Sequence, residues 1–165
     1  MVFAVDYKIK SDNSGLKSIK QALKNKKIRV GILDNPKEAE IGFLQHFGGE
    51  GVYYYGPHEG ETVDVPARPF IKAPVENYGK EIIERVFETT ELSKEGLDLA
   101  YNRVGNWLKS KIQEYIENVE LAKSLNPTAN GDGGNSWRTI ETKGFDHPLM
   151  DKGNLLSSIK YEVSK

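Results

Sequence analysis

Residues 93–119, SKEGLDLAYNRVGNWLKSKIQEYIENV, decide how this chain folds, because they form its longest periodic segment. Apolar side chains return along this stretch every three or four residues, which is the spacing of one face of an α-helix. We therefore predict a long amphipathic helix whose apolar stripe faces the core. The stripe consists of Leu97, Ala100, Tyr101, Val104, Leu108, Ile112, Tyr115 and Val119.

The segments on either side of this helix predict the rest of the fold. A second helix is expected over residues 69–90, with a stripe that includes Ile71, Ile82 and Val86. Alternation of apolar and polar residues predicts strands at 3–9, 27–33 and 158–164. Strands at both ends with helices between them predict an α+β fold, in which a mostly antiparallel sheet packs against two long helices.

Other segments are less regular. Residues 16–23 have helical spacing with lysines on the other face, and residues 37–47 fit either a helix or a strand. A glycine-rich stretch follows over 48–69, in which 52–55 and 62–65 could pair as a hairpin. The polar tract 126–136 has too few apolar residues for a core and is expected to be flexible or an arm.

We interpret residues 1–165 as a single domain, which suits the length of the chain. Its parts are an N-terminal strand and basic helix (1–27), a long loop or hairpin (48–69), two helices (69–120), a flexible tract (126–136) and a C-terminal turn and strand (143–165).

The composition excludes several kinds of chemistry. The chain has no cysteine, so it forms no disulfide, thiolate nucleophile or cysteine-ligated metal centre. It contains no apolar run of the roughly 18–20 residues that a membrane span needs, and its start is a poor signal peptide. We therefore expect a protein made in a reducing cytoplasm, with no membrane partner.

Charge is divided unevenly along the chain although the net charge is −1. Residues 1–30 hold eight Lys and Arg against two acids, and residues 34–95 hold thirteen acids against six Lys and Arg. Opposite faces of this kind would suit head-to-tail contacts between subunits. Solvated faces of a monomer are the alternative, and a nucleic-acid-binding role for the lysines of 1–30 is a further one.

Few residues suggest catalysis or metal binding. The three histidines, His46, His58 and His147, lack the spacing that places two imidazoles on one helix face. His58 and Glu59 form the best candidate pair for a hydrolase, and this pair is a weak signal. The segment 48–51 is glycine-rich but lacks the Lys-Ser/Thr of a phosphate-binding loop. We predict no enzyme activity, no cofactor and no metal.

Two segments carry more information. In Val65–Ile71, VPARPFI, prolines on both sides of Arg68 fix an extended backbone, which holds the guanidinium at a rigid corner. Arg68 is then suited to bind a carboxylate or backbone carbonyls, either in a neighbouring subunit or in its own loop, and Phe70 should anchor the following helix. In 143–159, KGFDHPLMDKGNLLSSI, Asp151, Lys152 and Gly153 predict a turn or helix start ahead of the terminal strand.

With these segments the chain resembles the phage virion-morphogenesis and tail-component proteins, which join heads to tails or complete tails. The resemblance rests on an aromatic–Gly element at 45–48, the Pro-Ala-Arg-Pro-Phe box at 66–70, and the Lys-Gly…Pro-Leu-x-Asp-x-Gly-x-Leu…Ser-Ile element at 143–159. Lys152 stands where threonine is usual in the family, and the 126–136 tract is longer and richer in glycine. The motif residues are Phe47, Gly48, Pro66, Arg68, Pro69, Phe70, Lys143, Gly144, Pro148, Leu149, Asp151, Gly153 and Leu155.

The resemblance, which spans residues 28–163, implies a structural subunit of a tailed-bacteriophage neck. It implies a ring of copies, usually six, between the head connector and the tail tube, where DNA is met only non-specifically in the lumen. It implies location in the virion, no catalysis and no cofactor. A tail-terminator ring is the alternative within this class, and a phage-encoded hydrolase using His58 and Glu59 is the alternative outside it.

Overall fold

The computed structural model describes residues 3–4, 26–91 and 93–164 of the chain. Over these residues it is an α+β protein with two small antiparallel sheets. The elements in chain order are β1 (Phe3–Ala4), β2 (Lys27–Ile32), α2 (Pro36–Phe47), β3 (Gly49–Val52), β4 (Thr62–Val65), α3 (Lys72–Glu88), α4 (Lys94–Glu117), α5 (Val119–Ser124), the 3-10 helix η1 (Ala129–Gly131), α6 (Trp137–Lys143), α7 (Asn154–Ser157) and β5 (Ile159–Ser164).

The larger sheet has the order β1-β2-β5, with β2 in the centre. β2 and β5 pair over their whole length, from Lys27 opposite Ser164 to Ile32 opposite Ile159. The strands predicted at 27–33 and 158–164 are therefore confirmed. Of the strand predicted at 3–9, the described residues include only β1, which pairs with β2. The helix predicted at 16–23 and most of the basic N-terminal segment lie outside the described residues.

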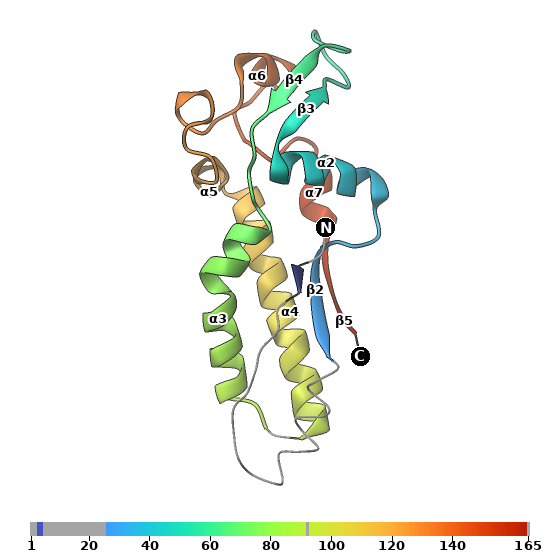
Figure 1. The fold of residues 1–165 in the computed structure, drawn as a ribbon, viewed down its shortest axis with the longest axis vertical. Helices are drawn as coiled ribbons and strands as arrows, with labels where there is room; N and C mark the ends of the chain where they lie inside the picture. The colour runs from blue at the N-terminus through green and yellow to red at the C-terminus, as the bar shows by residue number, and fades with distance from the viewer. Residues whose placement is uncertain (1–2, 5–25, 92, 165) are drawn as a thin grey trace.

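The two predicted long helices are α3 and α4, which lie side by side along the molecule (Figure 1). Ser93 caps α4, since its Oγ accepts a hydrogen bond from Gly96 N at 3.0 Å. Most of the predicted stripe is buried, including Ala100, Val104 and Ile112, whereas Tyr101 is half-buried and Val119 is half-buried and begins α5. Its apolar spacing therefore predicted the core correctly.

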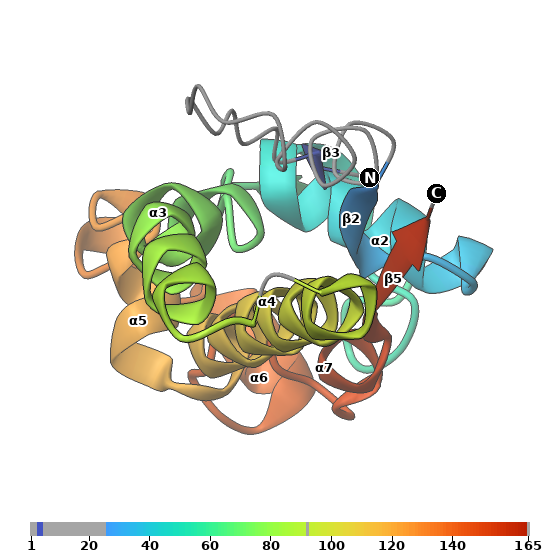
Figure 2. The same cartoon turned by 90° about the horizontal axis from the view of Figure 1, so that it is seen from below.

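The packing of the helices on the sheet differs from the expectation in one respect. α4 contacts both β2 and β5, whereas α3 packs on α4 (Figure 2). Among the described elements, the prediction of helices against the sheet thus holds for α4 and has to be corrected for α3, which forms a further layer. The apolar spacing of α3 shows that one of its faces is buried but not which element covers that face.

Residues 37–47 form the helix α2, so the strand alternative for them is excluded. Asn35 caps this helix by accepting a hydrogen bond from Glu38 N at 3.3 Å, and Pro36 occupies its first turn. Gly48 ends it with a φ of 74°, and a Cβ there would lie 2.8 Å from Ala67 N. Glycine therefore lets the end of α2 meet the segment that follows β4.

The stretch 48–69, predicted as a long loop or hairpin, contains the hairpin β3–β4. Gly49 pairs with Val65 and Val52 pairs with Thr62. The strand predicted at 62–65 is confirmed, whereas its partner lies at 49–52 and not at 52–55. This pairing extends to the end of α2, so the stretch is not one long glycine-rich loop.

The described part of the molecule has two halves, which follow one another along its long axis. The larger sheet and the helices α3 and α4 form one half, and α2, the β3–β4 hairpin and the short helices α5 to α7 form the other (Figure 1). Within the part of the chain that is described, no helix combines the length and the apolar composition that a membrane crossing requires.

Candidate functional site

The Pro-Ala-Arg-Pro-Phe corner is buried where the two halves of the molecule meet. Arg68 is 2% exposed, and Phe70 is fully buried with its ring edge-on to that of His46 at 5.4 Å. Arg68 Nη2 donates to the backbone oxygens of Gly133 at 3.0 Å and Gly134 at 2.7 Å. Arg68 therefore binds backbone carbonyls, as one of the predicted alternatives has it, and these carbonyls belong to its own chain.

The tract 126–136 is the partner of this corner. Asn126 Nδ2 donates to Ala67 O at 3.1 Å, and Ala129 of η1 is buried. Gly133 has a φ of 81°, a conformation that glycine adopts without strain, and its carbonyl accepts from Arg68. The tract thus folds against its own subunit and does not project as an arm, because the arginine supplies the contacts that its polar sequence lacks.

The second predicted segment, 143–159, forms a chain of tight turns around a few buried residues. Gly144 ends α6 and Gly153 precedes α7, each with a positive φ, and Pro148, Leu149 and Leu155 are buried. Of the turn or helix start predicted at 151–153, the helix start is confirmed, since Gly153 directly precedes the single-turn helix α7. Leu149 and Leu155 belong to the main hydrophobic core, which ties the segment to the rest of the fold.

Lys143 begins this segment and is a half-buried cation of the site. Its Nζ donates to His147 O at 2.7 Å and lies 4.9 Å from the centre of the Phe145 ring. Burial lowers the pKa of the Lys143 ammonium to about 8, and the nearby positive charge of Arg68 adds to this effect. Asp151 and Asp146 act in the opposite direction.

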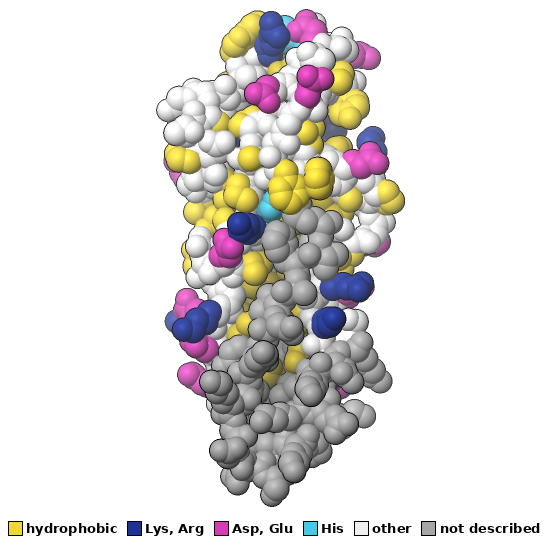
Figure 3. Space-filling view, viewed as in Figure 1, with side chains coloured by type: hydrophobic (Ala, Val, Ile, Leu, Met, Phe, Trp, Pro, Cys, Tyr) yellow, Lys and Arg dark blue, Asp and Glu magenta, His cyan; other side chains and the backbone are white. Residues whose placement is uncertain are grey.

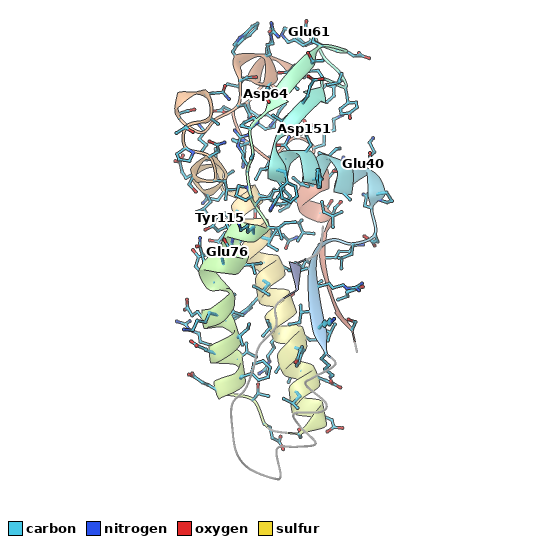
Figure 4. All side chains as sticks on the ribbon, in the orientation of Figure 1. Glu40, Glu61, Asp64, Glu76, Tyr115 and Asp151 are labelled. Atoms are coloured by element: carbon cyan, nitrogen blue, oxygen red, sulfur yellow. The ribbon has the colours of Figure 1, made fainter. Side chains whose placement is uncertain are left out.

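The two predicted segments meet at one cavity of about 780 Å³. α2, the hairpin, the corner, and residues of 130–155 contribute to its wall. In Figure 4, Asp64 of β4 and Asp151 lie at this hairpin end of the molecule. Of the motif residues, the cavity is lined by Pro66, Arg68, Lys143, Leu149, Asp151 and Leu155. The cavity is not lined by the remaining ones, which are Phe47, Gly48, Pro69, Phe70, Gly144, Pro148 and Gly153.

His58 does not form the predicted pair with Glu59, which is exposed. Its Nδ1 lies 3.2 Å from Glu61 Oε1 and its Nε2 lies 2.9 Å from Glu141 Oε2. These carboxylates, Glu141 foremost, raise the pKa of His58 above its usual 6.5. The cluster ties the hairpin tip to α6 and does not line the cavity.

The other two histidines serve the fold. His46 is 2% exposed, and burial lowers its pKa to about 4 with help from Lys72. His147 Nε2 lies 3.1 Å from Ile116 O. Across the described ranges, no group of three or more histidine, cysteine or acidic side chains is arranged to hold a metal ion.

Sequence reasoning missed several residues of this site. Asn135 and Thr142 line the cavity, and Tyr53 connects the hairpin to α6 through its hydroxyl, 3.1 Å from Thr139 Oγ1. Their sequence contexts contain no motif. Each contact joins segments far apart in the chain, so local spacing carries no signal for it.

The half of the molecule that holds the cavity also exposes large apolar side chains (Figure 3). Phe43 and Phe47 of α2 are 57% and 54% exposed, whereas the buried residues of that helix are Glu38, Gly42 and His46. Val52, Tyr54 and Trp137 are exposed on the hairpin and on α6.

Comparison with protein-family models, with curated proteins and with solved structures finds no match for this chain. A function therefore has to be argued from its residues and their arrangement.

Proposed function

We propose that this protein is a structural subunit of a tailed-bacteriophage neck, where copies form a ring, usually of six, that joins the head connector to the tail or completes the tail. The observation that carries the proposal is the motif set at 45–48, 66–70 and 143–159, which follows the order and spacing of the neck family. The last two of these segments border a single cavity, as expected if they form one structural unit of such a subunit.

The exposed face of α2 supports an assembly role. Phe43 and Phe47 present two aromatic rings, 4.7 Å apart between centroids, on the side of the helix that faces away from the core. Aromatic side chains are enriched in the centres of protein interfaces, where their burial stabilises the complex. A neck subunit has neighbours in its own ring and in the rings above and below, and it needs such surfaces.

The alternatives receive less support from the geometry. A hydrolase would need His58 and its carboxylates to face a substrate-sized hollow, and the cluster lies outside the cavity. A tail-terminator ring fits the same fold and differs in its neighbours. A nucleic-acid-binding role would depend on residues 1–30, most of which lie outside the described part.

The decisive experiment is deletion of this gene from the phage genome that encodes it. The neck proposal predicts full heads and finished tails that remain separate in lysates, with plaque formation restored by the wild-type gene in trans. Tails of irregular length would identify a tail terminator instead. Normal joined particles would contradict both.

Point variants then test the proposed surface. Phe47→Ser should fold but fail to restore plaques, because the exposed ring contributes to assembly and not to the core. Leu99→Ser on α4 is a matched control, since Leu99 is 52% exposed and lies near the start of that helix, outside the half of the molecule that holds α2. Equal plaque counts for the two variants would exclude this face of α2 from the neck contacts.

A further inference from the structure

The strand β5 leaves one edge of the larger sheet open. It stands at the end of the order β1-β2-β5 and pairs with β2, from Ile159 opposite Ile32 to Ser164 opposite Lys27. Among the described residues, no backbone hydrogen bond joins β5 to any other element. Figure 1 shows β5 as the outermost strand of this sheet, with no described helix or strand alongside its outer edge. The N–H and C=O groups on that edge are therefore available to a further strand.

This edge lacks several features that usually protect an open strand. The sequence of β5, IKYEVS, contains no proline or glycine, and its pairing with β2 runs without a bulge. Its only charged residues, Lys160 and Glu162, are exposed. The residues that alternate with them belong to the hydrophobic core or pack against it, and they are Ile159, Tyr161 and Val163. The edge thus has one apolar face and one face with two opposite charges.

The two charges select one way of pairing this strand with itself. When two copies of β5 pair antiparallel about a two-fold axis, one residue lies opposite its own copy. With Tyr161 in that position, Lys160 of each copy lies directly opposite Glu162 of the other. A shift of the axis to Lys160 or to Glu162 places two like charges opposite each other instead. Opposite charges stabilise a cross-strand pair and like charges destabilise it, so the register centred on Tyr161 is favoured.

The apolar face of β5 fits the same register. Ile159 lies opposite Val163 of the second copy, and the two Tyr161 side chains are neighbours at the axis. Aromatic and β-branched cross-strand pairs of this kind stabilise a sheet. Tyr161 and Val163 are only half-buried in the single subunit, so both have apolar surface left to bury in such a contact.

The ion pairs that these charges already form do not prevent the pairing. Lys160 Nζ contacts Asp34. Glu162 Oε1 accepts a hydrogen bond from Arg29 Nη1 at 3.1 Å. All four side chains are about half-exposed, and exposed ion pairs contribute little to stability. An ammonium has three donors and a carboxylate accepts several hydrogen bonds, so each group can keep its present partner while it meets a second one.

We propose that the free protein forms a weak two-fold dimer in which β5 pairs with β5 of a second copy, in the register that places Lys160 opposite Glu162. The larger sheets of the two copies then form one continuous sheet, with α4 of each copy on the same face. A contact through one strand of six residues is smaller than a stable interface, so the dimer should be reversible and depend on concentration.

The proposal goes beyond the neck function and does not rest on it. Neighbours in a ring meet through two different surfaces, whereas the β5 contact is two-fold and uses the same strand twice. Pairing through β5 therefore cannot close the proposed ring. It describes the subunit before assembly.

Sedimentation equilibrium of the full chain, from micromolar to millimolar concentration, measures the dimer. Lys160→Glu and Glu162→Lys should each weaken self-association by roughly tenfold or more, since each turns both opposite-charge pairs of the dimer into like-charge pairs. A mixture of these two variants should restore the dimer, because every Lys then meets a Glu again. Lys80→Glu changes an exposed lysine of α3, so this matched control should associate like the wild type.

The double variant Lys160→Glu/Glu162→Lys keeps the test decisive if a single variant fails to fold. It should dimerise with itself and not with the wild type, because the exchanged charges complement only each other. A carbodiimide joins a contacting ammonium and carboxylate into an amide with loss of water. It should link Lys160 to Glu162 between copies, which mass spectrometry of mixed isotope-labelled and unlabelled protein detects.

Other results would overturn the proposal. A wild type that stays monomeric up to millimolar concentration would exclude a second copy as the occupant of the β5 edge. Equal association of the wild type, both charge variants and the control would place the contact elsewhere on the molecule. Oligomers larger than a dimer would indicate a heterologous contact in place of the two-fold one. Gene deletion measures the joining of particles and none of these quantities, so failure of one proposal is distinguishable from failure of the other.

Discussion

Replacing Phe70 with alanine tests whether the corner at 66–70 anchors the fold. The Phe70 side chain is 0% exposed and packs edge-on against His46. Emptying a core aromatic site costs about 3–5 kcal/mol, because transfer of the ring and the cavity left behind both destabilise the folded state. For a domain of this size, each kcal/mol lowers Tm by about 2–4 °C, so a fall of about 6–20 °C is expected.

Urea unfolding followed by far-UV circular dichroism measures this cost directly. Fluorescence is less suitable, since Trp107 and Trp137 are 44% and 65% exposed and their emission should change little on unfolding. Phe43→Ala is the matched control, because it removes the same ring from an exposed position and should stay within about 0.5 kcal/mol of the wild type. A loss for Phe70→Ala as small as that of the control would refute the anchoring role.

Three further predictions follow from other contacts. Arg68→Met should lower the free energy of unfolding by about 1.5–3 kcal/mol or more, because it leaves the carbonyls of Gly133 and Gly134 without their charged donor. Arg68→Lys should recover little of this loss. A Tm of Arg68→Met equal to that of the wild type would contradict the prediction. Gly105→Ala should cost about 1–3 kcal/mol in the same urea assay, since the new Cβ would lie 2.3 Å from the Tyr161 ring, and truncation of that ring should relieve the cost. The charged contact between His58 and its two glutamates should be fully formed below pH 6.5, and it should weaken as pH rises through the raised pKa of the histidine. NMR titration of the His58 ring measures that pKa, and an unshifted value would contradict the contact.

The sequence predicted only part of the role of the corner at 66–70. The two prolines predicted a rigid backbone, and a buried Phe70 is confirmed. The sequence left open whether Arg68 binds a neighbour or its own chain. Its acceptors prove to be 65 and 66 residues away in the tract 126–136, so Arg68→Ala is expected to destabilise the subunit itself.

The helix α2 shows a second limit of sequence reasoning. Phe43 and Phe47 are the natural candidates for its buried face by composition, yet the buried residues are Glu38, Gly42 and His46. A Cβ at Gly42 would lie 2.5 Å from Ile32 of β2, so the helix approaches the sheet through its smallest residue. Backbone proximity decided this orientation, and it leaves the aromatic rings available to a partner.

The sequence by itself determined the elements whose apolar spacing is sustained, namely the helices α3 and α4 and the strands β2 and β5. Their periodicity is a property of neighbouring residues and needs no knowledge of the rest of the chain. Only the tertiary structure decided which segments meet: α3 on α4, the polar tract on Arg68, and the two predicted segments at one cavity. These contacts join residues far apart in the chain, and their free energy depends on burial and on partners that no local pattern encodes.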